Sequence, residues 1–312
     1  MIRVVEFVAR RLAATILVLL GLSLLVFLML RLVPGDPIQV YLGVEVADPT
    51  LEQRLRQSLG LDRPVLVQYA RYVGRIVTGD LGRSILTQRR VGEDLLPKAL
   101  NTAQLATVSL MMAVTAGLSL GTLAAARRFT LWDHVGLLAS LAGISLPVFW
   151  IGLLLQWTVS VQLGLLPSAG KGGLERLILP ALTLSAPSVA LISRVARASM
   201  LEVFRQDYIR VARAKGLAER RVMVRHILPN GILPILTVVG LQFGYMLAGA
   251  VLTETVFAWP GLGRLIVDAI KDRDYPVVQG AVLLVGAVFV LLNLTVDLIY
   301  VAVDPRLRRS AR

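Results

Sequence analysis

Six long apolar segments dominate this sequence and restrict the folds open to it. A helix needs about 20 consecutive apolar residues to cross a bilayer core of about 30 Å. Segments of that length lie at about 12–30, 99–126, 135–163, 177–198, 231–257 and 277–303. The first is too long for a signal peptide and no A-x-A-like cleavage site follows it, so we expect it to remain as a span. We therefore predict an all-α membrane protein with six transmembrane helices.

The composition agrees with a membrane protein and removes several other classes. Of the 312 residues 56% are apolar, and the formal net charge is +13. In a soluble protein this charge would suggest nucleic-acid binding. Here the basic residues flank apolar segments, where they orient the chain, so we expect no nucleic-acid partner. The sequence contains no cysteine, which excludes disulfides, thiol nucleophiles and thiolate metal sites.

The distribution of Lys and Arg among the short loops predicts the orientation. Arginines precede the first apolar segment, follow the second at Arg127 and Arg128, and recur through 194–229. Because basic loops remain in the cytoplasm, we place both termini there. The resulting parts are the N-terminus with the first transmembrane helix (1–31), an extracytoplasmic segment (32–98), a membrane core (99–303) that contains a cytoplasmic segment (199–230), and a cytoplasmic tail (304–312).

The extracytoplasmic segment has helical patterns of its own. Leucines recur at helical spacing over 51–59, and apolar or aromatic residues do so over 65–76. The second pattern follows Asp62 and Pro64, which suit a helix start. We predict a small folded cap on the outer side of the bundle. A structural lid and a docking surface for an external partner both remain open.

The chain lacks the chemistry that would power a membrane enzyme or a self-driven transporter. The nearest match to a phosphate-binding loop, GLLPSAGKG at 164–172, has the wrong spacing and lacks the hydroxyl residue. His134 and His226 have no carboxylate cluster at ligand spacing, and neither accompanies a nucleophilic serine motif. Glu254 and Asp297 lie near the ends of apolar segments, where we expect them to cap or tether helices rather than relay protons. We expect no catalytic site and no metal site.

A strongly basic stretch interrupts the apolar pattern at 204–229, and we call it the basic segment. Over 207–216 it has the marks of a short helix, with Asp207 as N-cap and Gly216 at the left-handed position after the last turn. A second basic helical run follows at about 218–227. From composition alone, a groove on another protein and anionic lipid headgroups are equally good partners.

The spacing within the basic segment resembles the cytoplasmic EAA loop of binding-protein-dependent ABC importers. Arg210–Val211–Ala212 precede Gly216, and His226–Ile227–Leu228–Pro229 follow it. Arg210 replaces the Glu of the general motif, and His226 replaces an Ile. With Arg210 in this position, the sequence YIRVARAKGL resembles the wording typical of the dipeptide, oligopeptide and nickel branch of that family.

Further motifs extend the resemblance over nearly the whole chain. In order they are LRLVPGDP at 30–37, LGLDRPVLVQY at 59–69, GDLGRS at 79–84, ETVFAWPGLG at 254–263 and DPR at 304–306. The resemblance implies the type I ABC-importer permease fold, in which the chain forms half of a translocation pathway. It implies as partners a second homologous permease, two cytoplasmic ATPases that carry ATP and magnesium, and an external solute-binding protein.

The resemblance also implies that the basic segment seats in a cleft of an ATPase. The residues that it assigns to this contact are Asp207, Arg210, Ala212, Arg213, Ala214, Lys215, Gly216, Leu228 and Pro229. We expect the small residues to allow close docking and the basic residues to orient the segment. No cofactor is expected in this chain itself.

The expected substrates are di- or oligopeptides, with nickel or another small solute as the alternative. Peptides need hydrogen-bond partners, so the candidate residues lining the passage are Gln156, Ser185, Ser188, Gln242 and Tyr245. Ordinary bonding between helices would explain the same residues equally well. A self-sufficient secondary transporter or channel is the alternative of another class, and it leaves the basic segment unexplained. We place the chain in the cytoplasmic membrane of a bacterium or archaeon.

Overall fold

The computed structural model describes residues 2–32, 53, 57, 62–128 and 130–303, and their regular structure is helical. Within these residues one isolated β-bridge, Arg83 with Arg90, is the extent of strand pairing. The all-α prediction therefore holds for the described chain. The chain forms two compact units. Unit 1 comprises Met1–Leu100 with Gly261–Arg312, and unit 2 comprises Asn101–Pro260.

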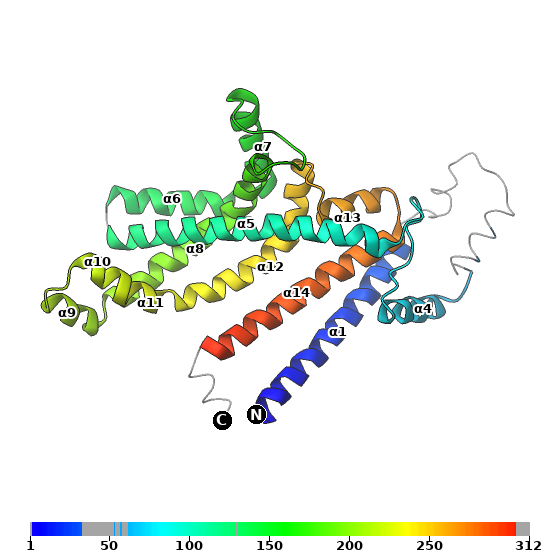
Figure 1. The fold of residues 1–312 in the computed structure, drawn as a ribbon, viewed down its shortest axis with the longest axis horizontal. Helices are drawn as coiled ribbons and strands as arrows, with labels where there is room; N and C mark the ends of the chain where they lie inside the picture. Colours follow the sequence, from blue (N-terminus) through cyan, green and yellow to red (C-terminus); the bar gives the residue numbers. More distant parts are fainter. Residues whose placement is uncertain (1, 33–52, 54–56, 58–61, 129, 304–312) are drawn as a thin grey trace. The chain divides into compact units, whose positions relative to one another are not determined.

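Unit 1 is built on two long helices that lie side by side (Figure 1). The helices of this unit are α1 (Ile2–Leu32), α4 (Val65–Val77), the first turns of α5 (Val91–Ala126), α13 (Leu262–Lys271) and α14 (Tyr275–Val303). α14 contacts both α1 and α13. The core of unit 1 includes Val26 of α1, Leu95 of α5 and Ala281 of α14. The predicted helix over 65–76 is thus confirmed as α4. The one over 51–59 lies outside the described residues except for residues 53 and 57, and the tail 304–312 lies outside them entirely.

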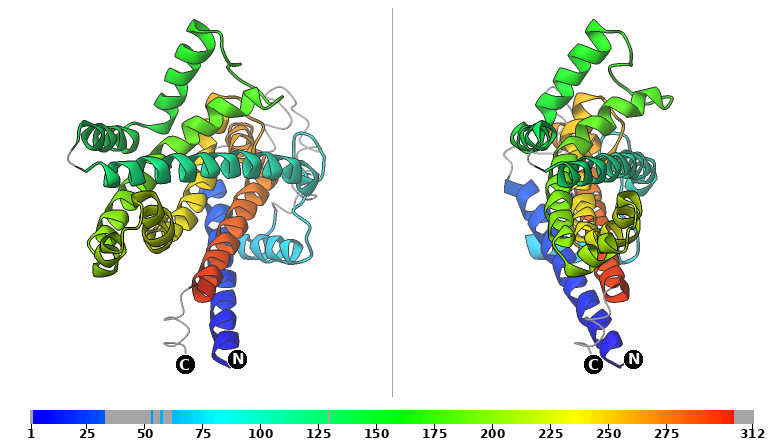
Figure 2. Two further views of the ribbon diagram at one scale, coloured as in Figure 1. Left: turned by 60° about the vertical axis from the view of Figure 1, so that its left-hand side comes forward. Right: turned by 90° about the vertical axis from the view of Figure 1, so that its left-hand side faces the viewer.

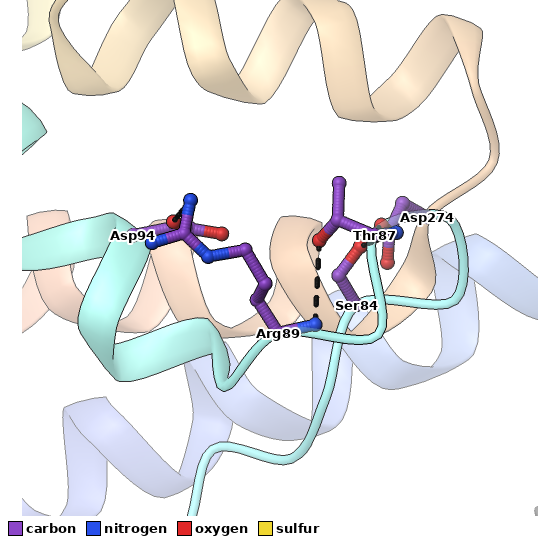
Figure 3. Close-up of polar contacts among 5 residues, drawn as sticks. All are labelled: Ser84, Thr87, Arg89, Asp94 and Asp274. Carbon is purple, nitrogen blue, oxygen red and sulfur yellow. Dashed lines mark hydrogen bonds and ion pairs between the residues drawn. The ribbon is translucent and has the colours of Figure 1, made fainter.

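A loop before α5 is fixed to the start of α14 by a buried carboxylate (Figure 3). Ser84 Oγ donates to Asp274, and the backbone N–H of Ile85 donates to Asp274 Oδ1 at 3.1 Å. Ser84 Oγ also accepts from the N–H of Thr87 at 2.9 Å. Both Ser84 and Asp274 are buried. Part of the GDLGRS motif therefore has a structural role, because its serine holds the loop against the turn between α13 and α14.

Unit 2 is organised around one central helix, α8 (Glu175–Phe204), on which its neighbours pack (Figure 2). Those neighbours are α6 (Leu131–Ser145), α7 (Val148–Leu155) and α12 (Leu233–Val256). The last turns of α5 approach α8 so closely that a Cβ on Gly121 would lie 2.4 Å from the carbonyl oxygen of Ser193. Half of the α8 residues are buried, which makes this helix the core of the unit.

The described structure holds fewer uninterrupted spans than the six that the sequence predicts. Val91–Ala126, Glu175–Phe204 and Tyr275–Thr295 are long and apolar enough to cross a membrane. A bent pair, Glu219–Gly231 with Pro234–Leu247, would make a fourth. Shorter apolar helices occupy Ala13–Met29 and Val148–Gln162. The count of six is therefore not established by helix length among the described residues.

The expected single span over 135–163 is corrected to two helices. α6 ends at Ser145, and α7 begins at Val148 after Pro147, whose extended backbone turns the chain. The residue before a proline avoids the α conformation, so Leu146 cannot continue the helix and α6 ends at Ser145. A π-helix, Gln156–Gln162, then continues α7.

Candidate functional site

The basic segment begins with a short helix, α9 (Asp207–Ala214), that follows α8 after a turn. Gln206 has the extended backbone of the N-cap position, and Asp207 is the first helical residue. The predicted N-cap role of Asp207 is therefore wrong by one position. Its carboxylate instead accepts a hydrogen bond from Arg210 Nη1 at 3.3 Å, one turn along the helix. An acidic group in the first turn still favours the helix dipole.

α9 ends as the sequence predicts, at a glycine with left-handed backbone. Gly216 has φ 75°, and its N–H donates to the carbonyl oxygen of Arg213 at 2.9 Å. A residue with a Cβ is strained in this conformation, whereas glycine is not. Nothing lies within 4 Å of where a Cβ would stand. The requirement for glycine here is therefore conformational and not steric.

The two sides of α9 face different surroundings. Ile209 and Ala212 are buried in the core of unit 2, in the same cluster as Met200 of α8. The small side chain of Ala212 thus lets α9 pack inward, and that side chain lies away from the exposed surface. Tyr208 and Val211 are 44% and 52% exposed. Sequence reasoning missed these two, although their i, i+3 spacing, centred about 100° around the helix from Ile209 and Ala212, was a usable signal.

Arg213 links the two helical runs of the basic segment. Its Nη2 lies 2.5 Å from Glu219 Oε1 and its Nε 3.1 Å from Oε2, a two-pronged pair. The Arg213 guanidinium also lies over the ring of Phe204, at 5.6 Å from the ring centroid. The hydrogen bond from Arg213 lowers the pKa of Glu219, and the same bond raises the pKa of Arg213. Arg213 is therefore occupied within the segment, while Ala214 and Lys215 are exposed.

The chain returns to α12 through three short helical pieces. They are α10 (Glu219–Val222), a π-helix (Met223–Ile227) and α11 (Leu228–Gly231). Val222 and Ile227 are fully buried, Leu228 is half-buried and Pro229 is exposed. The hydroxyl of Ser199 on α8 donates to the carbonyl oxygen of Gly231 at 2.8 Å. The basic segment is therefore fastened to α8 at its return as well as at its start.

The five candidates for lining a passage lie in different surroundings. Gln242 Nε2 donates to Ser188 Oγ at 2.6 Å, and both side chains are buried between α12 and α8. Ser185 is buried and donates to the carbonyl oxygen of Leu182. Gln156 donates to backbone carbonyls of Ser168 and Val256, so it holds a loop. Tyr245, in contrast, is 71% exposed. The structure brings together two of the five, and their role in a passage stays a prediction.

A second polar group of unit 2, which we call the Glu254 cluster, joins the start of the unit to the end of α12. Its side chains are those of Asn101, Thr102, Lys171, Glu254 and Trp259. The Thr102 hydroxyl donates to Glu254 Oε1 at 2.5 Å, and both side chains are buried. Asn101 Nδ2 donates to the carbonyl oxygen of Pro260. The indole N–H of Trp259 donates to the backbone carbonyl oxygen of Asn101. The predicted tethering role of Glu254 agrees with this geometry.

Lys171 extends the Glu254 cluster to the loop before α8. Its Nζ donates to Asn101 Oδ1 at 2.6 Å, and nearby Gly170 N–H donates to the carbonyl oxygen of Phe257. Within the part of the chain that the structure describes, no group of three or more His, Cys, Asp or Glu residues could hold a metal ion. The ETVFAWPGLG motif was the sequence signal for this cluster, although sequence reasoning did not pair it with Asn101 or Thr102.

Comparison with known proteins gives matches over almost the whole chain. Residues 117–309 match the family described as the binding-protein-dependent transport system inner membrane component. Residues 4–116 match the N-terminal part of such membrane components. The basic segment and the Glu254 cluster's α12 residues lie in the first match.

Curated relatives share about two fifths of the sequence at full length. The chain is 42% identical to the di/tripeptide transport system permease protein DppB of Pseudomonas aeruginosa (strain UCBPP-PA14), over 98% of this chain and 99% of the relative. It is 40% identical to the dipeptide transport system permease protein DppB of Escherichia coli (strain K12), with the same shares covered. It is 43% identical to the glutathione transport system permease protein GsiC of Salmonella paratyphi A, over 97% and 99%.

Solved structures show the same fold at lower sequence identity. The inward-facing methionine ABC transporter MetNI matches with a TM-score of 0.56 and 19% identity, over 67% of this chain and 96% of that chain. An amino acid ABC transporter matches with a TM-score of 0.52 and 18% identity, over 69% and 94%. Together, the two family matches and the full-length relatives show that this chain belongs to the family of binding-protein-dependent transport system inner membrane components.

Proposed function

We propose that this chain is a permease subunit of an ATP-driven ABC importer for di- or oligopeptides. Family membership gives the transport role, and the names of the full-length relatives, which transport dipeptides, tripeptides or glutathione, support a small-peptide substrate. The observation that carries the mechanism is the basic segment. Its helix α9 exposes the large side chains of Tyr208 and Val211, while Ile209 and Ala212 on the adjacent side are buried in the core of unit 2.

The proposed arrangement has six spans, with both termini and the basic segment in the cytoplasm. Arginines flank the apolar segments on that side, and long apolar helices with broken ones between them support several crossings. The chain would pair with a second homologous permease, so that each contributes half of the passage. Two ATPases would bind ATP and magnesium in the cytoplasm, and a solute-binding protein would deliver the peptide outside. The membrane is the cytoplasmic membrane of a bacterium or archaeon.

The proposed coupling surface is the exposed side of α9. Tyr208, Val211 and Ala214 offer an apolar strip that fits a hydrophobic groove, and Arg210 and Lys215 beside it can steer the approach to an acidic rim. Ile209 and Ala212 of α9 belong to the same core cluster as Met200 of α8. A displacement of α9 is therefore transmitted to α8, the core helix of unit 2. Closure of the ATPases could in this way move the helix that carries Ser185 and Ser188.

The first experiment is to tag the chain in its native membrane, solubilise it gently and identify what co-purifies. We expect a second permease of this family and two ATPases with phosphate-binding loops. The purified assembly in vesicles should take up labelled dipeptide only with ATP and the external binding protein. A lone chain, or a homo-oligomer that transports without ATP, would overturn the proposal in favour of a secondary transporter.

The coupling surface is tested by adding a charge to it. Val211→Glu should release the ATPases during purification, because a buried unpaired carboxylate is costly at an interface. Leu131→Glu is the matched control, since Leu131 is 78% exposed at the start of α6 and lies outside the basic segment. Equal ATPase recovery with the two variants would place the contact elsewhere.

A further inference from the structure

The helix α4 has an apolar side that is largely exposed. Leu66 and Val77 are 82% and 81% exposed, Ala70 is exposed and Val73 is half-buried between them. These four residues follow one another at steps of four, three and four, so they form one stripe along the helix. We call it the α4 stripe. In water such a stripe loses the hydrophobic stabilisation of burial, which indicates that it has a partner.

The opposite side of α4 is basic. At about 100° per residue, Arg71 and Arg75 lie roughly 150° around the helix from the α4 stripe. Both arginines are exposed. An aromatic side with Tyr69 and Tyr72 lies between the two, roughly 90° from the stripe. α4 therefore has three distinct faces: an exposed apolar face, an aromatic face on which Tyr72 is buried and Tyr69 half-buried, and an exposed basic face.

The aromatic face fixes α4 to α1 at a definite level. The Tyr69 hydroxyl is 2.9 Å from Ser23 Oγ and donates to the carbonyl oxygen of Leu20 at 3.2 Å. Tyr69 and Tyr72 also pack against the ring of Phe27. Nearer the C-terminal end of α1, Arg31 Nη2 donates to Gln68 Oε1 at 2.5 Å, just beyond the apolar stretch Ala13–Met29. α4 thus lies against the last turns of the apolar part of α1, where the charged end of that helix begins.

The same turns of α1 are themselves exposed and apolar. Leu24, Leu25, Leu28 and Met29 are each between 41% and 60% exposed. The proposed placement of α1 as a span puts this surface among lipid tails. The contacts of Tyr69 and Gln68 hold α4 at the level of this surface, and the arginines lie on the side of α4 away from the α4 stripe.

We propose that α4 lies in the outer interface of the membrane, with its stripe among the lipid tails and its arginines at the phosphate groups. An amphipathic helix with apolar residues on one side and arginines on the other binds an interface in this way, with its apolar side 5–10 Å or so into the acyl boundary. Tyr69 and Tyr72 are of the residue type that is enriched at this depth. α4 is then an anchor on lipid that sets the depth of α1, and not a lid open to water. The proposal rests on the proposed membrane placement of α1.

The absence of cysteine from the sequence makes a depth measurement direct. We would introduce Leu66→Cys, Val77→Cys, Arg71→Cys and, on α1, Leu25→Cys, one at a time in the full-length chain. Each protein is labelled with a nitroxide and placed in vesicles of phosphatidylcholine and phosphatidylglycerol. Collision rates are then measured with oxygen, which concentrates among lipid tails, and with a water-soluble nickel complex.

We expect labels at 66 and 77 to collide more with oxygen than with nickel, as the label at 25 does, and the order to reverse at 71. The proposal is overturned if 66 and 77 collide with nickel as readily as 71 does while 25 reports lipid. Protection at 66 and 77 that arises only after the external binding protein is added would assign the stripe to that protein. Nickel collisions at 25 as well would overturn the membrane placement of α1, and the α4 proposal with it.

Discussion

The Glu254 cluster and the basic segment belong to the same compact unit but place their acidic side chains in opposite surroundings. Glu254 is fully buried, and Thr102 donates to its carboxylate from the start of the unit. In the basic segment, the side chains of Arg213 and Glu219 remain 42% and 60% exposed although they form a close ion pair. A buried charge without its partner is costly, whereas an exposed pair contributes little to stability.

This difference separates a region that fixes the fold from one that is free to meet another protein. The Glu254 cluster ties the start of unit 2 to its end through the buried bond between Thr102 and Glu254 and the part-buried bonds of Asn101 and Trp259. The basic segment is buried on one side only, through Ile209, Ala212 and Ile227, and its remaining surface is exposed. Substitutions should therefore affect folding in the first region and coupling in the second.

The largest expected effect is the loss of the buried carboxylate. Glu254→Ala removes the buried carboxylate to which Thr102 donates and opens a cavity, so the free energy of unfolding should fall by about 3 kcal/mol. Thermal unfolding of the detergent-solubilised chain measures this. The free energy of unfolding of Glu254→Gln should lie between those of Glu254→Ala and the unchanged chain, because the amide oxygen can still accept from Thr102.

The neighbouring residue supplies the control for that substitution. Thr255 is exposed, and its hydroxyl donates only to the carbonyl oxygen of Val251 in its own helix among the contacts described. Thr255→Ala should change stability by less than about 0.5 kcal/mol. Equal unfolding midpoints for Glu254→Ala and Thr255→Ala would show that burial of the carboxylate does not hold unit 2 together.

The second effect tests the other region, at the end of α9. Gly216→Val forces a β-branched residue into the left-handed conformation, at a cost of about 1–2 kcal/mol that the exposed turn can relieve by moving. We expect normal amounts of protein in the membrane but weaker stimulation of ATP hydrolysis by the binding protein. Gly216→Asn should retain coupling, since Asn tolerates this conformation. Normal transport by the Val variant would argue against a coupling role.

The contrast between the two regions also explains what the sequence could predict. Gly216 was predictable because a left-handed residue after a helix is a local property, and its φ of 75° confirms it. Family motifs located Glu254 but not Thr102, because the two residues are separated by 152 positions and no local pattern links them. The burial of Ala212 was likewise hidden, since small residues serve equally well for packing inward and for docking outward.

The prolines show the same limit within the membrane core. Pro147 separates α6 from α7, yet Pro180 and Pro187 lie inside α8 without ending it. Each of the three prolines lacks the backbone N–H that a helix uses, so the sequence alone predicts the same disturbance of the helix at all three. Packing decides the outcome: Pro180 lies in the most buried helix of the unit, whose neighbours hold it in shape. The predicted span over 135–163 failed for this reason.

An intermediate effect is expected where the two helices of the core share a neutral hydrogen bond. Gln242→Leu removes the donor to Ser188 Oγ and should lower the free energy of unfolding by about 1 kcal/mol. Adding Ser188→Ala should recover part of that loss, because the unpaired hydroxyl is removed too. Both measurements use thermal unfolding in detergent. If peptide uptake falls while stability is unchanged in the double variant, the pair acts on the passage rather than on the packing.

The smallest effect is the ion pair of the basic segment, which pH should reveal better than stability does. Arg213 lowers the pKa of Glu219 in the folded state below its ordinary value of 4.5, so the pair stabilises the segment above that pH. The stabilisation is lost as the pH falls through the lowered folded-state pKa, and because both side chains are largely exposed it should stay below about 1 kcal/mol. Carbon NMR of labelled glutamate carboxyls, assigned with Glu219→Gln, should show the Glu219 midpoint rising in Arg213→Gln but not in Arg210→Gln, whose arginine bonds Asp207 instead. Equal midpoints in the two arginine variants would mean that the pair does not persist in solution, and that Arg213 is as free as Arg210 to meet a partner.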